Sequence, residues 1–369
     1  MSDPRAERLA DLLIRHCISV NHNDRVLIQG PAVAELLVLP LAEAVLRAGG
    51  HPHPLVYPDR YEELYGRCAQ DHQLSFTPTF ELLAYQQFEA RVLIHAAVNT
   101  RLFSRLEPRK DSLWNSAWEA IGKAQFEREA KGEFKRVTTL YPTQAYAQDA
   151  HMSLGEFEDL CYRACHVNGL QDDAIAHWEG MAHDNEARIQ AISGHNTVHL
   201  RSDDCDIEFS IDGSKFVSAA GKVNMPDGEI YTGPVEDSAS GWIRFTYPSL
   251  VSGIEVAGVE LVFAEGVVTE AKARVGEPTL KARLALDEGA SRLGEFGIGT
   301  NYGVTECTGM PLLDEKIGGS IHLALGLGYP ETGNNNKSAI HWDLITDFSK
   351  DAEIALDGDV VYKDGRFIV

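Results

Sequence analysis

The sequence has little positive charge and no long hydrophobic run. Lysine and arginine together number 33 against 55 aspartates and glutamates, which gives a formal net charge of −22. Nucleic acids and anionic membranes bind basic faces, so this balance argues against both kinds of partner. No stretch approaches the roughly 18 apolar residues of a membrane helix, and charged residues interrupt the N-terminus too early for a secretory signal. We therefore expect a cytoplasmic protein that binds neither nucleic acid nor membrane.

Cysteine is also scarce, with 6 residues in a chain of 369. Cys161 and Cys165 lie four positions apart in a helical stretch, but no second pair follows to complete a zinc site. We interpret the cysteines as reduced and mostly buried thiols, which are typical of a reducing compartment.

Several signatures of common enzyme classes are missing. The chain has neither a Walker phosphate loop nor a Gly-x-Ser-x-Gly elbow. Residues 297–303, GIGTNYG, resemble a dinucleotide fingerprint only loosely and lie outside any strand–helix–strand unit. Nucleotide binding and serine-hydrolase chemistry are therefore not indicated.

What is present first is an alternation of strand and helix signals. Apolar runs at residues 25–29 and 91–95 are typical of buried strands, and residues 34–48 and 111–129 have helical periodicity. A capping-box pattern at Ser153 predicts a helix that extends to about Val167. Strands that alternate with helices indicate a parallel α/β sheet.

The pattern changes near Gly194. Short alternating strands and Asp-Gly or Glu-Gly turns follow, and residues 280–293 provide one strong helix signal. At very roughly 150 residues per domain the length suggests two domains. We predict an N-terminal α/β domain with a parallel sheet, residues 1–193, and a mostly β (α+β) metal-binding C-terminal domain, residues 194–369.

Chemistry-bearing residues gather in the second half. Glu229 follows the tight turn of Pro226, Asp227 and Gly228, so its carboxylate can be aimed into a cleft. Glu295 follows a helix that we expect to end at Leu293 or Gly294, among small and apolar neighbours. An exposed turn carboxylate is the alternative interpretation of Glu229.

Histidines follow further along the chain. His322 lies in an apolar run that is typical of a buried strand, close to Asp314 and Glu315. His341 and Asp343 share a face of an extended strand, because side chains alternate with a period of two. Imidazole and carboxylate at this spacing suit a metal, and a buried His–Asp hydrogen bond is the alternative.

Two histidines and three or four carboxylates from one domain suit a pair of divalent ions. Such ions lie about 3.5–4 Å apart and need a carboxylate that can bridge them. Carboxylates also balance the positive charge of the pair.

These segments resemble the thermophilic-aminopeptidase family of metallopeptidases, closely in the C-terminal half and more loosely before it. The likeness lies in N-M-P-D-G-E at residues 224–229, D-E-G-A-S-R-L-G-E at 287–295, H-L-A-L-G at 322–326 and H-W-D at 341–343. The resemblance implies a set of metal ligands, namely Glu229, Glu295, Glu315, His322, His341 and Asp343. The stretch from Glu315 to His322 is two residues longer than in that family, and an ordinary charged turn is the alternative for Glu315.

The resemblance also implies a function. It predicts a dinuclear aminopeptidase that uses two divalent ions (Zn, Co or Mn) to hydrolyse the first peptide bond of peptides with a free N-terminus. Glu295 would bridge the ions, Tyr329 would donate a hydrogen bond to the developing oxyanion, and Glu229 or Glu315 would shuttle protons. A homodimer is expected from the same analogy.

Two other functions fit parts of the sequence. His322, His341 and Asp343 also form the two-histidine, one-carboxylate set of a mononuclear non-haem Fe(II) enzyme, such as a ring-cleaving dioxygenase. A metal-stabilised binding protein without catalysis is the second alternative. Glu229 and Glu295 favour the peptidase, because a mononuclear iron site does not need them.

Overall fold

A computed structural model describes residues 3–169, 173–251 and 253–369. The chain forms two compact units, of which the first holds Met1–Ile175 and Gly221–Met225. The second holds Ala176–Ala220 and Pro226–Val369. The division into folding domains at residues 193 and 194 stays a prediction. Within the described ranges, no helix is both long and apolar enough to cross a membrane.

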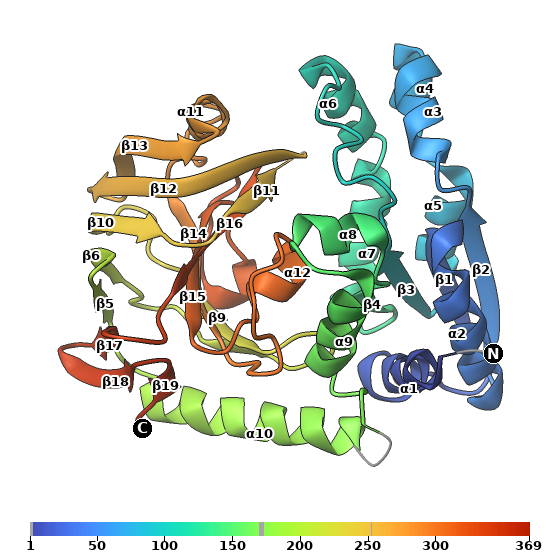
Figure 1. Cartoon of the computed structure of the whole chain (residues 1–369), viewed down its shortest axis with the longest axis horizontal. Helices are drawn as coiled ribbons and strands as arrows, with labels where there is room; N and C mark the ends of the chain where they lie inside the picture. The colour runs from blue at the N-terminus through green and yellow to red at the C-terminus, as the bar shows by residue number, and fades with distance from the viewer. Residues whose placement is uncertain (1–2, 170–172, 252) are drawn as a thin grey trace. The chain divides into compact units, whose positions relative to one another are not determined.

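The first unit is built on a parallel sheet, as the alternating signals predict. Its strands lie in the order β2-β1-β3-β4-β8, and all four pairings are parallel. Figure 1 shows them with helices packed around them. Their bounds are β1 (Arg25–Pro31), β2 (His51–Tyr57), β3 (Ala90–His95), β4 (Lys135–Leu140) and β8 (Asn224–Met225).

The helices of this unit follow the predicted pattern with one exception. They are α1 (Pro4–Leu12), η1 (Leu13–Cys17), η2 (Ala32–Ala34), α2 (Glu35–Arg47), α3 (Tyr61–Cys68), α4 (Asp71–Leu74), α5 (Thr79–Gln87), α6 (Pro108–Ser116), α7 (Glu119–Glu129), α8 (Gln144–Asp149) and α9 (Leu154–Ala164). The capping box forms at Ser153, and α9 ends at Ala164, three residues before the predicted end.

The single helix predicted over residues 111–129 is wrong, because the chain turns between α6 and α7. Trp114 packs against Tyr65 and Phe103, with ring centroids 5.1 and 5.7 Å away. Trp118 instead packs against a separate cluster that includes Ile121. The turn lets two tryptophans four residues apart enter different clusters.

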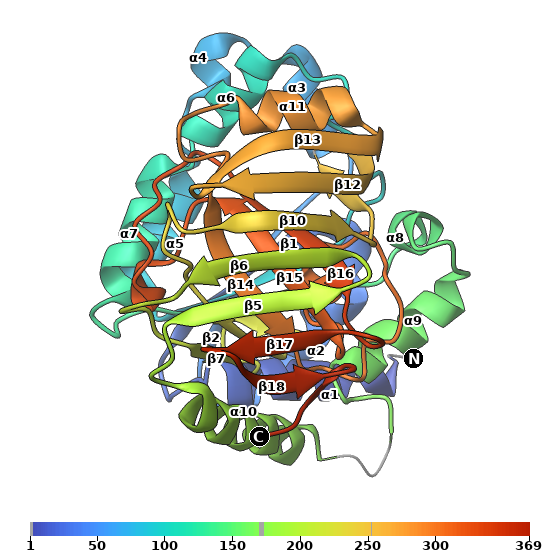
Figure 2. The ribbon, with the colours of Figure 1, turned by 90° about the vertical axis from the view of Figure 1, so that its left-hand side faces the viewer.

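The second unit consists mainly of two antiparallel sheets. The larger has the order β11-β12-β10-β6-β5-β17-β18-β19, with β13 paired to β12, and the smaller has the order β16-β15-β14-β9-β7. Figure 2 shows the larger sheet in front of β14, β15 and β16, and their facing side chains form one hydrophobic core. The parallel N-terminal sheet and the mostly antiparallel C-terminal part together confirm the predicted fold class.

The strand bounds are β5 (Thr197–Ser202), β6 (Cys205–Ser210), β7 (Val217–Ala219), β9 (Glu229–Thr232), β10 (Ser240–Phe245), β11 (Ser249–Val251), β12 (Ile254–Ala264), β13 (Val267–Val275), β14 (Leu293–Gly299), β15 (Ser320–Gly326), β16 (His341–Asp347), β17 (Glu353–Leu356), β18 (Asp359–Lys363) and β19 (Arg366–Phe367). The helices are α10 (Ala174–Ile192), α11 (Glu277–Leu284), α12 (Pro311–Asp314) and η3 (Pro330–Thr332). α10 lies beside β19, where the Arg188 guanidinium stands 5.4 Å from the centre of the Phe367 ring.

The helix predicted over residues 280–293 is wrong beyond its first residues. α11 ends at Leu284, and β14 begins at Leu293. Asp287 accepts hydrogen bonds from the backbone N–H of Ala290 and of Ala339 and from the Ser338 hydroxyl. These side-chain bonds hold residues 287–290 in a turn and compete with a helix. Glu295 therefore lies inside a strand.

Candidate metal centre

The site is built on four neighbouring strands of the smaller sheet. Glu229 opens β9, Glu295 lies in β14, His322 in β15, and His341 and Asp343 in β16. These strands are adjacent in the order β16-β15-β14-β9. Five polar side chains that span more than a hundred residues of sequence therefore meet on one sheet.

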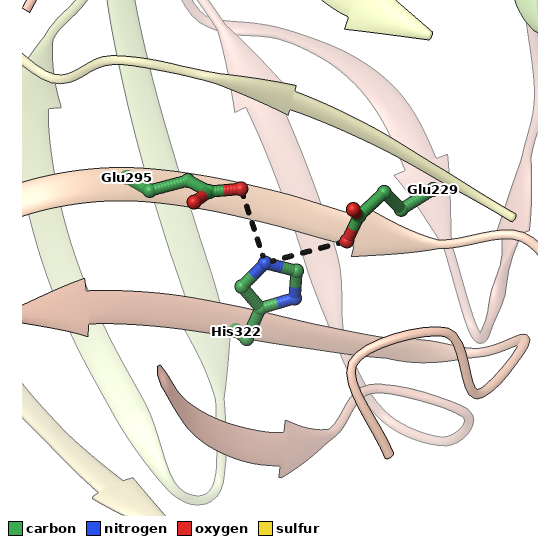
Figure 3. A group of neighbouring side chains, drawn as sticks. All are labelled: Glu229, Glu295 and His322. Carbon is green, nitrogen blue, oxygen red and sulfur yellow. Dashed lines mark hydrogen bonds and ion pairs between the residues drawn. The ribbon is translucent and has the colours of Figure 1, made fainter. Parts of the chain in front are cut away.

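Glu295 occupies the middle of this group, and its two carboxylate oxygens face different histidines. Oε1 lies 3.4 Å from Nε2 of His322, and Oε2 lies 3.3 Å from Nε2 of His341. Glu229 Oε2 is 3.6 Å from the same His322 nitrogen, as Figure 3 shows. Asp343 Oδ1 is 3.4 Å from His341 Nε2. Two ligand groups result, and Glu295 belongs to both.

Glycines provide the space for these side chains. Gly297 lies opposite His322 in the β14–β15 pairing, and a Cβ at Gly297 would overlap the imidazole ring. Gly228 adopts a positive φ of 115° immediately before Glu229, and a Cβ there would meet Asn301 at 2.8 Å. Gly297 is thus a position at which the His322 ring leaves no room for a side chain.

The donor atoms fit divalent metal. Glu229 Oε2, Asp343 Oδ1 and His322 Nδ1 are buried and lack hydrogen-bond partners in the described part of the chain. Buried polar atoms without partners are costly, and ion binding removes that cost for the two carboxylate oxygens. Oxygen and imidazole nitrogen donors without thiolate suit Zn²⁺, Co²⁺ or Mn²⁺.

The raised pKa values of the two histidines in the metal-free protein also indicate a site that favours cations. Burial opposes a charge on His322, yet the carboxylates of Glu295 and Glu229 outweigh burial and raise its pKa to about 9. Against the same opposing burial, Asp343 and Glu295 raise the pKa of His341. The protonated imidazoles thus supply positive charge among the carboxylates, which divalent ions would supply in their place.

Lys316 connects Glu315 to the proposed ligand Glu229 through hydrogen bonds. The Lys316 ammonium is buried, with 1% of its surface exposed, and donates to Glu229 Oε1 at 2.5 Å and to Glu315 Oε2 at 3.1 Å. Asp227 Oδ1 lies 3.9 Å from it. Burial and the nearby Asp343 carboxylate raise the pKa of Glu315. Sequence reasoning missed Lys316, although its position next to Glu315 could have suggested an ion pair.

Tyr329 follows β15 at the rim of the site. Its ring centre lies 5.0 Å from that of His341 and 5.7 Å from that of Tyr231. Burial of the hydroxyl raises its pKa, so the group stays protonated and can donate a hydrogen bond.

Asn185 of α10 is buried and donates hydrogen bonds to the chain around Glu229. Sequence reasoning did not single it out. Its Nδ2 donates to the backbone carbonyl of Glu229 at 3.3 Å and to Thr300 Oγ1 at 3.4 Å. No local sequence signal distinguishes it from a surface asparagine. The structure thus places all seven predicted residues at one site, while their roles as ligands or catalysts stay predictions.

These two adjoining groups of carboxylates and imidazoles define a candidate centre for divalent metal. The chain belongs to the thermophilic metalloprotease (M29) family, because the sequence model of that family matches residues 2–367. The family resemblance predicted from the sequence is confirmed.

Individual relatives match nearly the whole chain. It is 25% identical to "Aminopeptidase T" of Thermus thermophilus, over 97% of this chain and 95% of the relative. It is 24% identical to "Aminopeptidase 2" of Geobacillus stearothermophilus, over 98% and 94%.

Solved structures show the same fold. Wild-type AmpT from Thermus thermophilus has a TM-score of 0.86 at 21% identity, over 99% of both chains. The 2,5-dihydroxypyridine dioxygenase from Pseudomonas putida has a TM-score of 0.59 at 14% identity, over 99% of this chain and 97% of that one. These structural likenesses establish the fold alone.

Proposed function

We propose that this chain is a metal-dependent aminopeptidase that holds two divalent ions and removes the first residue of peptides with a free N-terminus. Membership in a metalloprotease family and two relatives named aminopeptidases support the reaction class. One observation carries the dinuclear centre: the two oxygens of Glu295 face two different imidazoles at 3.4 and 3.3 Å. A bridging carboxylate of this kind is what a pair of ions requires.

The ligands divide into two groups. Glu229, Glu295 and His322 would hold one ion, and Glu295, His341 and Asp343 the other. Zn, Co and Mn all suit this donor set. Glu315 belongs to neither group and accepts a hydrogen bond from Lys316 at 3.1 Å. Two divalent ions would supply an activated water and polarise the scissile carbonyl.

The remaining chemistry belongs to the protein's own side chains. Tyr329 stays protonated and would donate a hydrogen bond to the oxyanion that develops on the substrate carbonyl. Lys316 donates both to Oε1 of Glu229 and to Oε2 of Glu315, so its hydrogen bonds engage both predicted proton shuttles. Either Glu229 or Glu315 would carry the proton to the leaving amine.

Assembly and location extend the proposal. We infer a homodimer that resides in the cytoplasm. The location is supported by the reduced thiols of Cys161, Cys205 and Cys307. Light scattering of the purified protein would measure the dimer directly, and a mass of one chain would exclude it.

The experiment combines metal analysis with hydrolysis of aminoacyl and N-acetylated aminoacyl chromogenic substrates. The protein is purified without chelator or affinity metal. Two Zn, Co or Mn per chain, with activity that requires the free amine and disappears on chelation, is the expected result. One iron per chain with oxygen uptake on a dihydroxylated ring would instead establish the dioxygenase. Metal without either activity would leave the binding protein.

A further inference from the structure

The candidate metal centre contains a positive charge of its own, the ammonium group of Lys316. Its Nζ donates to Glu229 Oε1 at 2.5 Å and to Glu315 Oε2 at 3.1 Å, and Asp227 Oδ1 lies 3.9 Å away. Burial opposes the charge on this lysine, but the carboxylates of Glu229, Glu315 and Asp227 outweigh burial and raise its pKa. The lysine is therefore charged, and its shortest contact is to a proposed metal ligand.

The backbone holds Lys316 in this position. The Lys316 carbonyl accepts from the Asn301 N–H at 3.0 Å, and the Lys316 N–H donates to the Leu313 carbonyl at 3.1 Å. Asn301 also donates from Nδ2 to the Asp227 carbonyl at 2.8 Å, so the segments that carry Asp227 and Lys316 are joined. The lysine side chain is 1% exposed. Lys316 is thus kept beside Glu229 by its backbone as well as by its charge.

The two oxygens of Glu229 have different surroundings. Oε1 accepts from Lys316. Oε2 is buried without a hydrogen-bond partner in the described part of the chain and lies 3.6 Å from Nε2 of His322 (Figure 3). This leaves Oε2 for a metal ion. A carboxylate that is already paired with one cation attracts a second cation less strongly, because the two positive charges repel each other in a low-dielectric interior.

The proposed ligands form the Glu229 group, namely Glu229, Glu295 and His322, and the Asp343 group, namely Glu295, His341 and Asp343. Each group has two carboxylates and one imidazole, and both share Glu295. Among the residues that the structure describes, no lysine or arginine lies within ion-pair distance of Glu295 or Asp343. Histidine gives up its proton when it binds metal, whereas Lys316 keeps its charge. The lysine is therefore a difference in charge between two otherwise matched groups.

We propose that Lys316 competes with metal for Glu229, so that the Glu229 group holds the more weakly bound of the two ions. The ion of the Asp343 group binds first, and the ion of the Glu229 group is the one that exchanges with the solution. This inference rests on the proposed dinuclear centre and adds the order in which its ions bind. Lys316 acts through Glu229 and is a positioning residue.

Titration of the metal-free protein with Zn²⁺ tests this order. Histidine labelled with ¹⁵N reports the two groups separately by NMR, since His322 belongs to one group and His341 to the other. The chain has 14 histidines, so His322→Gln and His341→Gln variants assign the two signals. We expect the first equivalent of Zn²⁺ to shift the His341 signal and the second to shift the His322 signal. The two dissociation constants should differ by about tenfold or more.

Two substitutions separate the charge of Lys316 from its hydrogen bond. Lys316→Gln removes the charge but retains an N–H donor, and Lys316→Met removes both. We expect the dissociation constant of the second step to fall by about tenfold in each variant, while that of the first step changes less. A lysine that only held Glu229 in place would give the opposite result, because its loss in Lys316→Met would weaken the second step.

The matched control is Lys350→Met, which removes an exposed lysine from the same unit and should leave both dissociation constants unchanged. The order of binding in the unsubstituted protein decides the question even where a Lys316 variant fails to fold without metal. A His322 signal that shifts first, or together with that of His341, would overturn the proposal.

Hydrolysis of the aminoacyl chromogenic substrates is measured on the same samples. Two ordered steps without hydrolysis would contradict the proposed aminopeptidase and leave the role of Lys316 intact. Hydrolysis by a protein whose two ions bind equally tightly, with no change in Lys316→Gln, would do the reverse. Binding of a single ion would contradict the dinuclear centre and the inference together.

Discussion

At the scale of single residues, Glu295 differs from the other proposed ligands because its two oxygens face two different imidazoles. A Glu295→Gln substitution keeps the size of the side chain but replaces one oxygen with an NH2 group, which cannot bind metal. Since both ligand groups share this carboxylate, we expect metal content below one ion per chain and at least a hundredfold loss of hydrolysis. Metal analysis by mass spectrometry measures the first effect, and the chromogenic assay measures the second.

The matched control is Glu270→Gln, which removes an exposed carboxylate on β13 of the same unit. It should retain two ions and full activity. Full metal content in Glu295→Gln would contradict the bridging role.

A second prediction at this scale concerns the substitution of Gly297. In Gly297→Ala the added methyl group overlaps the His322 ring, so the imidazole must move away from Glu229 and Glu295. We expect weaker metal binding and a loss of about 1–3 kcal/mol in the free energy of unfolding, typical of overpacking. Gly180→Ala on α10 is the control, because no atom lies within 4 Å of its Cβ position. That helix should gain up to about 1 kcal/mol, and equal behaviour of the two variants would refute the steric argument.

Lys316 makes a third prediction, because its ammonium is buried among carboxylates. In Lys316→Met, Glu229 and Glu315 lose the charge that balances them, and breaking a buried pair in this way costs about 3–5 kcal/mol. Urea unfolding of the metal-free protein measures the loss. Lys350→Met removes an exposed lysine instead and should change stability by less than about 0.5 kcal/mol. Unchanged stability in Lys316→Met would show that the lysine is not needed for charge balance.

At the scale of elements, α9 shows what local sequence determines. The Ser153 hydroxyl accepts from the Glu156 N–H at 3.4 Å, and the Glu156 carboxylate accepts from the Ser153 N–H at 2.8 Å. Ser153→Ala removes one side of this box, so we expect a loss of about 1 kcal/mol in the free energy of unfolding. Thermal unfolding detects it, and a neutral result would show that water replaces the cap.

The same contrast explains which parts of the fold could be predicted. The α9 start, the β1 and β3 strands and the His341–Asp343 pair depend on neighbours within a few residues, and the sequence predicts all of them. The helix expected at residues 280–293 fails because Asp287 bonds to Ser338 and Ala339, some fifty residues away. Asn185 was missed for the same reason, since its partners Glu229 and Thr300 are distant in sequence.

The sequence predicts which residues form the candidate site, but it does not predict how they are arranged. Strand alternation and the family resemblance point to the residues that gather there, but neither shows that Glu295 faces both imidazoles. That fact depends on the order β16-β15-β14-β9, which only the three-dimensional sheet provides.

At the scale of the whole molecule, charge links metal binding to folding. The chain carries a net charge of −22, and five of its carboxylates, Asp227, Glu229, Glu295, Glu315 and Asp343, surround the site. Without metal, Lys316 and protonated histidines balance part of this charge. Divalent ions replace those protons, because imidazole binds metal only when it is neutral.

This exchange gives the stability of the protein a defined pH dependence. The pKa of His322 is about 9 in the folded metal-free protein, against an ordinary value of 6.5. The stabilisation that protonation provides is therefore complete below pH 6.5 and is lost as the pH rises toward about 9. The metal-loaded protein does not depend on those protons. We expect the melting temperature of the loaded form to exceed that of the metal-free form by more at pH 9 than at pH 6, in calorimetry on protein demetallated by dialysis. A constant or shrinking difference would mean that His322 does not exchange its proton for metal.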